Sequence, residues 1–324
     1  MIYIKKILIL FGSNSYEHEV SCDSVNFVIK NIDTKKYNYD IVGIDYNNNW
    51  YLLNKNIKIT PKWLKEDKKI IDNTIKFAKK YDVVIPIIHG NTFEDGKLQS
   101  LFELNNINYV GCDSYSSIIS YDKLLTKLIL EKYNIKQVKY YIYQKDMNLN
   151  EIEYPIIIKP CKCGSSLGIN VAKNKKEALK CINEALKYDN SIILEQYIEN
   201  KEEYECAILQ DKKKTIVSDI GIILNNGCIY DYKAKYKTKI ETDIANINTK
   251  LKKEIQSTAK KIFHILGCKD LSRVDFLYDI DNKEIYFNEI NTMPGFTEIS
   301  MYPKLMNIKG VNAKKLISIL IENN

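Results

Sequence analysis

Continuous apolar runs alternate with amphipathic stretches over the first third of the chain. Three of these runs predict β-strands, at residues 7–11, 82–88 and 108–110. The first run stops at Gly12, and residues 17–31 then show the apolar spacing of a helix. Runs without alternation are typical of parallel strands that are buried on both faces. The pattern therefore predicts that residues 1–119 form an α/β domain around a parallel sheet.

The remaining chain shows shorter elements of both kinds. Helical spacing predicts helices at about 122–133, 175–187 and 249–266. Short apolar runs predict strands at 156–159, 192–197, 206–209, 216–223, 274–278 and 284–290. A polar segment at 225–248 interrupts this series. We expect three domains, 1–119, 120–202 and 203–324, or two domains with a mobile lid.

Composition narrows the class of protein. The 324 residues are 45% hydrophobic, which suits a globular protein with a sizeable core. No run reaches the roughly 18 apolar residues of a membrane helix, and the first residues lack a cleavable signal, so we expect a cytoplasmic protein without a membrane partner. The net charge of +7 is spread along the chain. It is weak evidence for nucleic acid, which we do not expect as a partner, and suits anionic small substrates equally well.

The cysteines and histidines do not suggest a disulfide framework or a zinc site. Eight cysteines are scattered, and only Cys161 and Cys163 are near neighbours. The three histidines do not complete a zinc site at finger-like spacing. A reduced protein is the simpler interpretation.

Arg273 is the only arginine in a sequence that otherwise uses lysine. A lysine cannot replace the planar fork with which a guanidinium binds two oxygens of a carboxylate or phosphate. A lone arginine can also arise by chance. Its neighbours make a functional role the better hypothesis. Two acidic residues, Asp275 and Glu289, follow it in the sequence, and Asn291 comes shortly after them.

These three side chains are candidate metal ligands. Asp275, Glu289 and Asn291 offer hard oxygen donors, and Glu289 and Asn291 share one face of a predicted strand. Such a set suits Mg²⁺ bound to phosphate. The alternative is a pair of surface strands with solvated acids. The apolar residues between them argue against it.

A candidate phosphate loop follows the predicted strand at 156–159. Lys159 ends the strand, and the glycine-serine loop, residues 160–168, contains Gly164, Ser165 and Gly168. Glycines permit positive φ, and the backbone N–H groups of such a loop can surround phosphate oxygens. The loop lacks the Gly-Lys-Ser/Thr ending of a Walker loop, and an ordinary turn remains the alternative.

Two further segments are ambiguous on their own. The segment Glu17-His18-Glu19-Val20-Ser21 places carboxylates at the start of a helix, where they can bind a substrate ammonium group or simply stabilise the helix end. His89-Gly90 ends a predicted strand, and a histidine there is often only a hydrogen-bonded structural residue.

Taken in order, these segments resemble the D-alanine–D-alanine ligases of the ATP-grasp superfamily, from Gly12 to about Leu305. The segments that carry the resemblance are EHEVS (17–21), HG (89–90), EDG (94–96), DK (122–123), KP (159–160), GSSLG (164–168), EQYI (195–198), DYKAKY (231–236), RVDF (273–276) and NEINTMPGFT (288–297). Cys163 departs from the family, where an acid is common, and the entry loop Gly12-Ser13-Asn14-Ser15 lacks the second glycine that is usual there. The resemblance implies a three-domain ATP-grasp fold. An N-terminal parallel-sheet α/β domain would bind substrate, and ATP would lie between a central lid domain and a catalytic C-terminal domain, both α+β.

The resemblance also implies roles for individual residues. The ATP-binding residues would be Lys123, Lys159, Glu195, Tyr197, Ile198 and Glu203. Two Mg²⁺ ions, with Mn²⁺ as a substitute, would be held by Asp275, Glu289 and Asn291. The catalytic residues would be Glu19, Ser165, Tyr236, Arg273 and Gly295, with Glu19, Ser165 and Tyr236 in one hydrogen-bonded set. The substrate-binding residues would be His89, Lys235 and Ser300.

The implied reaction joins two D-alanines through an acyl phosphate, for peptidoglycan precursor synthesis, in a protein that is a homodimer by analogy. D-serine or D-lactate as the second substrate is the alternative, although the Lys235-Tyr236 pair favours a dipeptide product. A catalytically silent ATP-binding regulator would have no need for an oxyanion-binding arginine. A dehydrogenase is weaker still, because no Gly-x-Gly-x-x-Gly follows the first predicted strand.

Overall fold

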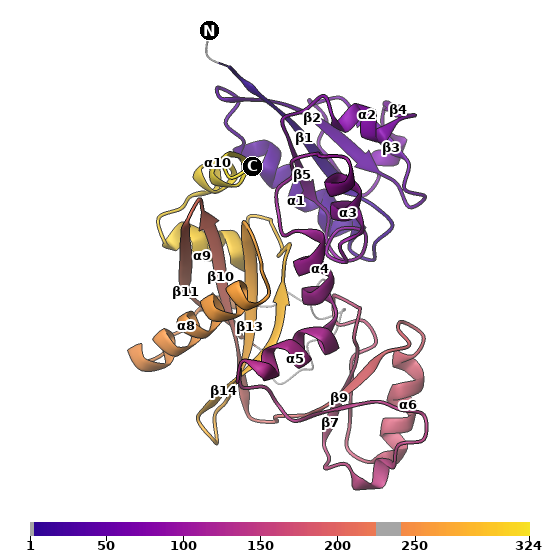
Figure 1. Cartoon of the computed structure of the whole chain (residues 1–324), viewed down its shortest axis with the longest axis vertical. Helices are drawn as coiled ribbons and strands as arrows, with labels where there is room; N and C mark the ends of the chain where they lie inside the picture. Colours follow the sequence, from indigo (N-terminus) through magenta and orange to yellow (C-terminus); the bar gives the residue numbers. More distant parts are fainter. Residues whose placement is uncertain (1–2, 225–240) are drawn as a thin grey trace.

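The computed structural model describes residues 3–224 and 241–324, and these residues form three β-sheets with flanking helices (Figure 1). Most of the polar segment expected at 225–248 lies outside the described residues. Lys235 and Tyr236 lie outside them too. Among the helices of the described part, none is long and apolar enough to span a bilayer.

The first sheet has the strand order β4-β3-β2-β1-β5. Its strands are β1 (Lys5–Gly12), β2 (Tyr37–Ile44), β3 (Trp50–Leu53), β4 (Lys68–Ile70) and β5 (Val83–Ile87). β1 pairs in parallel with β2 and β5, as its continuous apolar run predicts, while β3 and β4 extend the sheet in antiparallel fashion. The associated helices are α1 (His18–Asn31), α2 (Thr74–Ala78) and α3 (Lys97–Leu104), with a short 3₁₀ turn, η1 (Trp63–Lys65).

The strand expected at 108–110 is reduced to a single bridge between Tyr109 and Val84. The prediction of a strand was wrong because the chain turns at Gly111, whose φ of +119° favours glycine. The backbone N–H of Gly111 then donates to Asp270 Oδ2 of the third sheet at 2.8 Å. The segment therefore leaves the first sheet instead of extending it.

Two consecutive helices, α4 (Ser114–Tyr121) and α5 (Lys123–Lys132), lead from the first sheet to the second. Each begins at an aspartate that satisfies N–H groups of the first turn. Asp113 accepts from Ser116 N, and Asp122 accepts from both Leu124 N and Leu125 N. Because Asp122 ends α4 and caps α5, the chain bends there and α5 starts in a new direction.

The second sheet is antiparallel, with the order β6-β9-β7-β8. Its elements are β6 (Tyr140–Ile142), the 3₁₀ turn η2 (Leu149–Glu151), β7 (Ile156–Pro160), β8 (Asn170–Ala172), α6 (Lys175–Ala185) and β9 (Ile192–Gln196). α6 covers one face and buries Ala178, Ile182 and Ala185 in a small core of its own. In Figure 1 this unit forms the lower right part of the molecule.

The third sheet is also antiparallel, with the order β12-β11-β10-β13-β14. Its elements are β10 (Lys201–Asp211), β11 (Lys214–Leu224), β12 (Glu241–Ile244), α8 (Thr249–Ile265), β13 (Leu271–Asp279), β14 (Glu284–Asn291), α9 (Met301–Ile308) and α10 (Ala313–Glu322). Alternate side chains of β10 serve two cores. Cys206 and Ile208 pack on the side of α8, and Ala207 and Leu209 pack on the side of α9.

The first and third sheets share a hydrophobic core. α10 packs against α1, and Phe296 from the loop after β14 packs edge-on against Phe27 of α1 with ring centroids 5.7 Å apart. One sheet with parallel strands followed by two antiparallel sheets, all with flanking helices, agrees with the ATP-grasp fold that the resemblance implies. The domain boundaries at 119/120 and 202/203 stay predictions.

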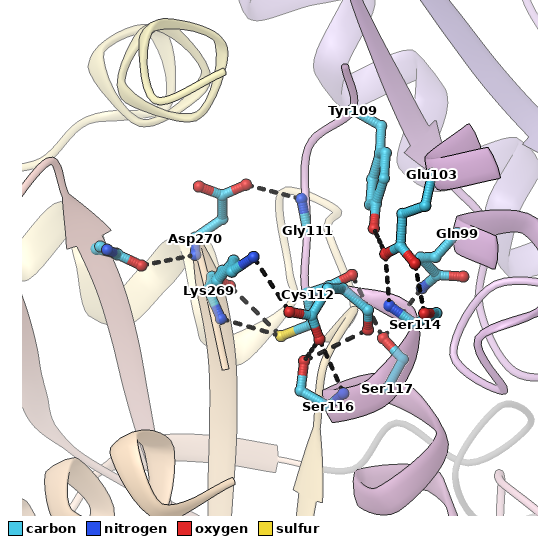
Figure 2. A network of polar contacts seen from close by, with 12 residues as sticks. Gln99, Glu103, Tyr109, Gly111, Cys112, Ser114, Ser116, Ser117, Lys269 and Asp270 are labelled. Carbon is cyan, nitrogen blue, oxygen red and sulfur yellow. Dashed lines mark hydrogen bonds and ion pairs between the residues drawn. The ribbon is translucent and has the colours of Figure 1, made fainter. Parts of the chain in front are cut away.

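A polar junction ties the first sheet to the start of β13 (Figure 2). Asp270 accepts hydrogen bonds from Gly111 N at 2.8 Å, Asn324 Nδ2 at 2.9 Å and Asn323 Nδ2 at 3.0 Å. Lys269 adds an ion pair with Asp113 at 3.1 Å. One buried carboxylate thus joins the linker after the first sheet, the strand that carries Arg273 and the C-terminal residues.

Candidate active site

Two adjacent cavities lie near the meeting of the three sheets. The first cavity, of about 210 Å³, lies between the second and third sheets. The second cavity, of about 850 Å³, lies between the third sheet, the start of α1 and the loop after β14. The residues that line both are Lys123, Cys163, Gly164, Ser165, Glu205, Arg273 and Glu289. The cavities therefore share one wall.

Nearly all of the predicted site residues that the structure describes line these cavities. The first cavity is lined by Lys123, Lys159, Ser165, Glu195, Tyr197, Ile198, Glu203, Arg273, Asp275 and Glu289. The second is lined by His89, Ser165, Arg273, Glu289, Asn291, Gly295 and Ser300. Glu19 lines neither and is exposed on α1. Lys235 and Tyr236 lie outside the described residues, so their predicted roles stay predictions.

Arg273 reaches the shared wall from β13 and contacts two carboxylates. Its Nε donates to Asp275 Oδ1 at 2.7 Å, and its Nη2 donates to Asp275 Oδ2 at 2.6 Å. The same Nη2 lies 3.2 Å from Glu205 Oε1 on β10. A lysine could not bind both oxygens of Asp275 in this way, since it lacks the planar fork. The guanidinium is therefore oriented by the protein itself.

Glu205 is a wall residue that the sequence interpretation missed. It lies opposite Asp275 in the register of β10 and β13, and Asp275 lies opposite Glu289 in the register of β13 and β14. Three acids thus form a row across neighbouring strands. The alternation of side chains could have identified Glu205, because it shares a strand face with the predicted site residue Glu203.

This row of acids concentrates negative charge. Burial raises the pKa of Asp275, Arg273 opposes that shift, and Glu205 and Glu289 add to it, so that the pKa is about 7. Burial also raises the pKa of Glu203 from its ordinary value. Raised carboxyl pKa values mean that nearby cations do not fully offset the burial of these acids. A bound cation would relieve this imbalance.

Asp275, Glu289 and Asn291 fit a magnesium ion by the kind of donor they supply. Asn291 Nδ2 donates to Asp275 Oδ2 at 3.0 Å, which leaves the oxygen of the Asn291 amide for a ligand. Both oxygens of Asp275 already accept from Arg273, so an ion would share this carboxylate with the guanidinium. Within the described part of the chain, no group of three or more acidic, histidine or cysteine side chains forms a ready-made ion cage. Mg²⁺ commonly combines one or two carboxylates with phosphate oxygens, and this donor set suits that pattern.

Lys123 connects the glycine-serine loop to the acids of β14. Its Nζ donates to Cys163 O at 2.7 Å and lies 3.8 Å from Glu289 Oε2. In the loop, Gly168 has the positive φ that the sequence predicts, at 71°, and Ser165 and Ser166 adopt positive φ as well, at 52° and 56°. Serines in this region are uncommon, and such backbone strain is often found at ligand sites.

Lys159 and Glu195 form a buried ion pair in the first cavity. Lys159 Nζ lies 2.6 Å from Glu195 Oε2 and donates to Asn288 Oδ1 at 3.0 Å. The second oxygen of Glu195 lies 2.8 Å from Nζ of Lys127, a residue of α5 that the sequence interpretation missed. Burial alone would raise the pKa of Glu195, but the two lysines outweigh it and lower the pKa to about 2. Glu195 is therefore a carboxylate at all ordinary pH values.

The rest of the first cavity combines apolar and polar surface. Ile157 and Ile169 line it from the second sheet, Leu277 lines it from β13, and residues 195–199 run along it. Glu203 adds a carboxylate from β10. A cavity with an apolar side and several charged groups suits a flat, partly polar ligand such as a nucleobase with its sugar.

The structure corrects the prediction for Glu19. Ser165 Oγ donates a hydrogen bond to Glu17 Oε1, and Glu17, not Glu19, lines the second cavity. The two glutamates are two positions apart, which on a helix places them about 200° apart around the axis. The sequence could not choose between them because both lie within one turn of the helix start. A Cβ added to Gly90 would lie 2.8 Å from Glu17 Oε2, so a glycine there makes room for this carboxylate.

His89 lines the second cavity, and both of its ring nitrogens have partners. Nδ1 lies 2.9 Å from the carbonyl oxygen of Met293, and Nε2 lies 2.8 Å from Ser24 Oγ. A carbonyl only accepts, so Nδ1 carries a proton and donates it to Met293 O. His89 therefore ties the end of β5 to the loop after β14 and to α1, which matches the structural alternative considered for it.

The loop after β14 brings Gly295 and Ser300 together. Ser300 Oγ accepts from Thr297 N at 3.1 Å and lies 2.7 Å from Thr297 Oγ1. A Cβ added to Gly295 would lie 3.0 Å from Ser300 Oγ, which is tight. Gly295 therefore allows the backbone to pass close to Ser300, on the wall of the second cavity.

Glu94 lines the second cavity, and the sequence interpretation assigned it no role. Its Oε1 accepts from Gly90 N at 2.7 Å, and the side chain is buried. Burial and the nearby charge of Glu17 raise the pKa of Glu94 to about 8. The cavity therefore contains a carboxyl group that is mostly protonated near neutral pH.

Comparison with protein families finds similarity over both halves of the chain. A family described as D-ala D-ala ligase N-terminus matches residues 6–112, and one described as D-ala D-ala ligase C-terminus matches residues 128–322. Among curated proteins, D-alanine–D-alanine ligase B of Clostridium tetani is 40% identical, in a match that covers 98% of this chain and 92% of that protein.

Solved structures show the same similarity. The VanG D-Ala:D-Ser ligase from Enterococcus faecalis superposes with a TM-score of 0.87 and 33% identity, covering 99% of both chains. A D-alanine–D-alanine ligase from Bacillus anthracis complexed with ATP superposes with a TM-score of 0.76 and 26% identity, covering 98% of this chain and 97% of that one.

Proposed function

Because the chain belongs to the D-alanine–D-alanine ligase family, we propose that it joins two molecules of D-alanine to D-alanyl-D-alanine, with conversion of ATP to ADP and phosphate. The observation that carries this proposal is the shared wall of the two cavities. Arg273, Lys123 and the glycine-serine loop lie between a cavity that suits a nucleotide and a cavity that suits small substrates. A phosphoryl group can then be passed from one cavity to the other.

In the first step, a carboxylate oxygen of one D-alanine attacks the γ-phosphorus of ATP. A new O–P bond forms, the bond to the β-phosphate oxygen breaks, and ADP leaves with the electron pair. Lys123 and Lys159 are the cations that offset the repulsion between these anions. Glu17, in place of the predicted Glu19, is the carboxylate positioned to hold the ammonium group of this first D-alanine.

In the second step, the amine of another D-alanine attacks the carbonyl carbon of the acyl phosphate. The tetrahedral oxyanion that results needs preorganised donors, and Arg273 and the backbone N–H of Gly295 line the cavity where it would form. The C–O bond to phosphate then breaks, the leaving phosphate takes up the proton that the amine loses, and the peptide bond remains. Exclusion of water matters here, because an acyl phosphate hydrolyses readily. The hydrogen bond from Ser165 to Glu17 holds the glycine-serine loop against α1 and supports that exclusion.

Nucleotide would occupy the first cavity. The adenine would lie along residues 195–198, with Glu203 at the ribose and Lys159 toward the phosphates. Asp275, Glu289 and Asn291 would hold two Mg²⁺ ions, with Mn²⁺ as a substitute. Such ions, when bound, neutralise charge on the transferred phosphoryl group. Burial, with smaller contributions from Glu205 and Glu289, raises the pKa of Asp275 to about 7 although Arg273 opposes the shift. A cation beside this buried carboxylate would favour its charged form, which supports an ion at this place.

The identity of the second substrate is the most specific part of the proposal. D-alanine is favoured because the curated relative from Clostridium tetani, at 40% identity, is named for it. D-serine is the second candidate, since one of the similar solved structures, with a TM-score of 0.87, is that of a D-Ala:D-Ser ligase. Ser300 and Lys304 line the second cavity and would meet the carboxylate of this substrate, together with Lys235. A D-lactate acceptor is the least favoured. A role in peptidoglycan precursor synthesis, a cytoplasmic location and a homodimer complete the proposal by family analogy.

A direct assay tests the proposal. Purified protein is incubated with Mg-ATP and D-alanine, and ADP and the dipeptide are both quantified. We expect the two products in equal amounts. Folded protein that forms neither would contradict the proposal. Competition between D-alanine, D-serine and D-lactate for the second position, read by mass spectrometry, then identifies the acceptor.

A further inference from the structure

Lys127 lies one helical turn after Lys123 on α5 but behind the wall of the first cavity. Its side chain is 1% exposed, and its Nζ lies 2.8 Å from Glu195 Oε1. Glu195 and Lys159 line the cavity in front of it, whereas Lys127 does not. Residues at i and i+4 share one helix face, so α5 carries one lysine to the acids of β14 and another to Glu195. Nothing in the proposed reaction uses this second lysine.

We propose that Lys127 is a positioning residue for nucleotide binding, which holds the Glu195 carboxylate so that the Lys159 ammonium stays directed into the first cavity. The proposal rests on the assignment of that cavity to ATP. It concerns affinity for the nucleotide and leaves the ligation chemistry to other residues.

The first argument is the number of hydrogen-bond donors. A lysine ammonium has three N–H groups. Lys159 directs one toward Glu195 Oε2 at 2.6 Å and one to Asn288 Oδ1 at 3.0 Å, which leaves one for a ligand. Lys127 Nζ forms an ion pair with the other oxygen, Oε1, at 2.8 Å, although the two atoms lack hydrogen-bond geometry. Without Lys127, the carboxylate can turn both oxygens toward Lys159 and draw its remaining donor away from the cavity.

The second argument is charge. Lys127, Glu195 and Lys159 together carry one net positive charge in a place where side chains of the first two are 1% and 2% exposed. Low exposure strengthens electrostatic attraction to an anion. Loss of Lys127 would leave a neutral pair, and the first cavity would lose attraction for the phosphates of a nucleotide.

The third argument is that Lys127 is itself held in place. Its Nζ lies 5.2 Å from the ring centroid of Tyr140 on β6, and its carbonyl oxygen accepts from Gln137 Nε2 at 3.0 Å. Burial lowers the pKa of Lys127, and the charge of Glu195 opposes that shift. The separation of 2.8 Å from Glu195 favours the charged form of Lys127. The ammonium is thus fixed between α5 and the second sheet at the position where it meets Glu195.

A purely structural role is the competing explanation, because a buried ion pair also joins α5 to the second sheet. Removal of one partner of such a pair is destabilising in any case. Stability alone therefore cannot separate the two explanations. Affinity for ATP, measured without D-alanine, can separate them.

The experiment compares Lys127→Met, Lys127→Arg and the control Lys132→Met, which removes an exposed lysine from the same helix. ATP affinity is measured by calorimetry, and KM for ATP, KM for D-alanine and kcat are measured separately, with thermal unfolding as a check. We expect Lys127→Met to raise the Kd and KM for ATP about tenfold or more, the size expected for one charge-assisted hydrogen bond. The kcat and the KM for D-alanine should change less than about threefold. Lys127→Arg should recover most of the affinity, and Lys132→Met should behave as the natural protein.

Two results would overturn the proposal. One is a variant Lys127→Met that is less stable but binds ATP as tightly as the natural protein. The other is a fall in kcat with no change in KM for ATP. If Lys127→Met does not fold, Lys127→Gln, which keeps an N–H donor but not the charge, is measured in its place, with the same expectation and the same contrary results. Failure of the natural protein to bind ATP would instead contradict the proposed function itself.

Discussion

Ser165 donates a hydrogen bond to Glu17, across 148 positions of the sequence. The donor lies in the glycine-serine loop that follows β7, and the acceptor lies directly before α1. This contact joins the second sheet to the first over the shared wall of the two cavities. The three predictions below concern ionisable side chains that line this wall or the second cavity.

Glu17 should matter for D-alanine and Glu19 should not. Glu17→Gln keeps an oxygen that can accept from Ser165 but removes the negative charge that faces the second cavity. We expect the KM for D-alanine to rise about tenfold to hundredfold, as for the loss of a charged hydrogen bond, with ATP affinity unchanged. Glu19→Gln is the matched control, because Glu19 is exposed on the same helix, and its kinetics should equal those of the natural protein. Steady-state kinetics of both variants test this prediction. A raised KM for D-alanine in Glu19→Gln but not in Glu17→Gln would contradict it and support the role predicted for Glu19 from the sequence.

Arg273→Lys should bind ATP and turn over slowly. The lysine keeps a positive charge on β13, but it cannot reproduce the two hydrogen bonds of 2.7 Å and 2.6 Å to Asp275 or offer a planar donor to the oxyanion. We expect kcat to fall about 10²- to 10³-fold, which is typical for the loss of one oxyanion donor. Calorimetry with ATP checks binding, and single-turnover kinetics check the chemical step. An unchanged rate would mean that the guanidinium does not serve the transition state.

Glu94 should make the protein less stable as the pH rises. The pKa of this carboxyl is about 8 in the folded protein and 4.5 ordinarily, so between these values the unfolded chain has released a proton that the folded chain retains. The unfolding free energy therefore decreases as the pH rises through that window. Glu94→Gln removes this contribution and should show a flatter dependence. Urea unfolding of the natural protein and of Glu94→Gln at several pH values between 4.5 and 8 gives the unfolding free energy of each. The same pH dependence in both proteins would contradict a raised pKa for Glu94.

Much of the fold follows from local pattern. The apolar run at 7–11 becomes the buried strand β1, and the run at 82–88 becomes β5, because continuous apolar strands need cover on both faces. The alternation along β14 places Glu289 and Asn291 on one face, as a period of two requires. Strands with mixed composition, such as β2, were not predicted, since their burial depends on neighbours far along the chain.

The choice among similar side chains came from packing. Glu17 and Glu19 are equivalent by local pattern, and only the position of Ser165 distinguishes them. In the sequence, nothing distinguishes Lys127 from the other lysines. Its role becomes visible only in the fold, where β9 places Glu195 next to it. Glu205 becomes significant only when β10 and β13 pair in a register that sets it opposite Asp275.

The amino-acid sequence by itself determined the kinds of chemical group available, the order of the secondary structure and the resemblance to a ligase family. The tertiary structure decided which carboxylate meets which cation. Local preferences extend over a few residues, whereas the cavities are built from segments that are far apart in the chain. Their contacts depend on the pairing of strands and the packing of helices, and no local pattern records these.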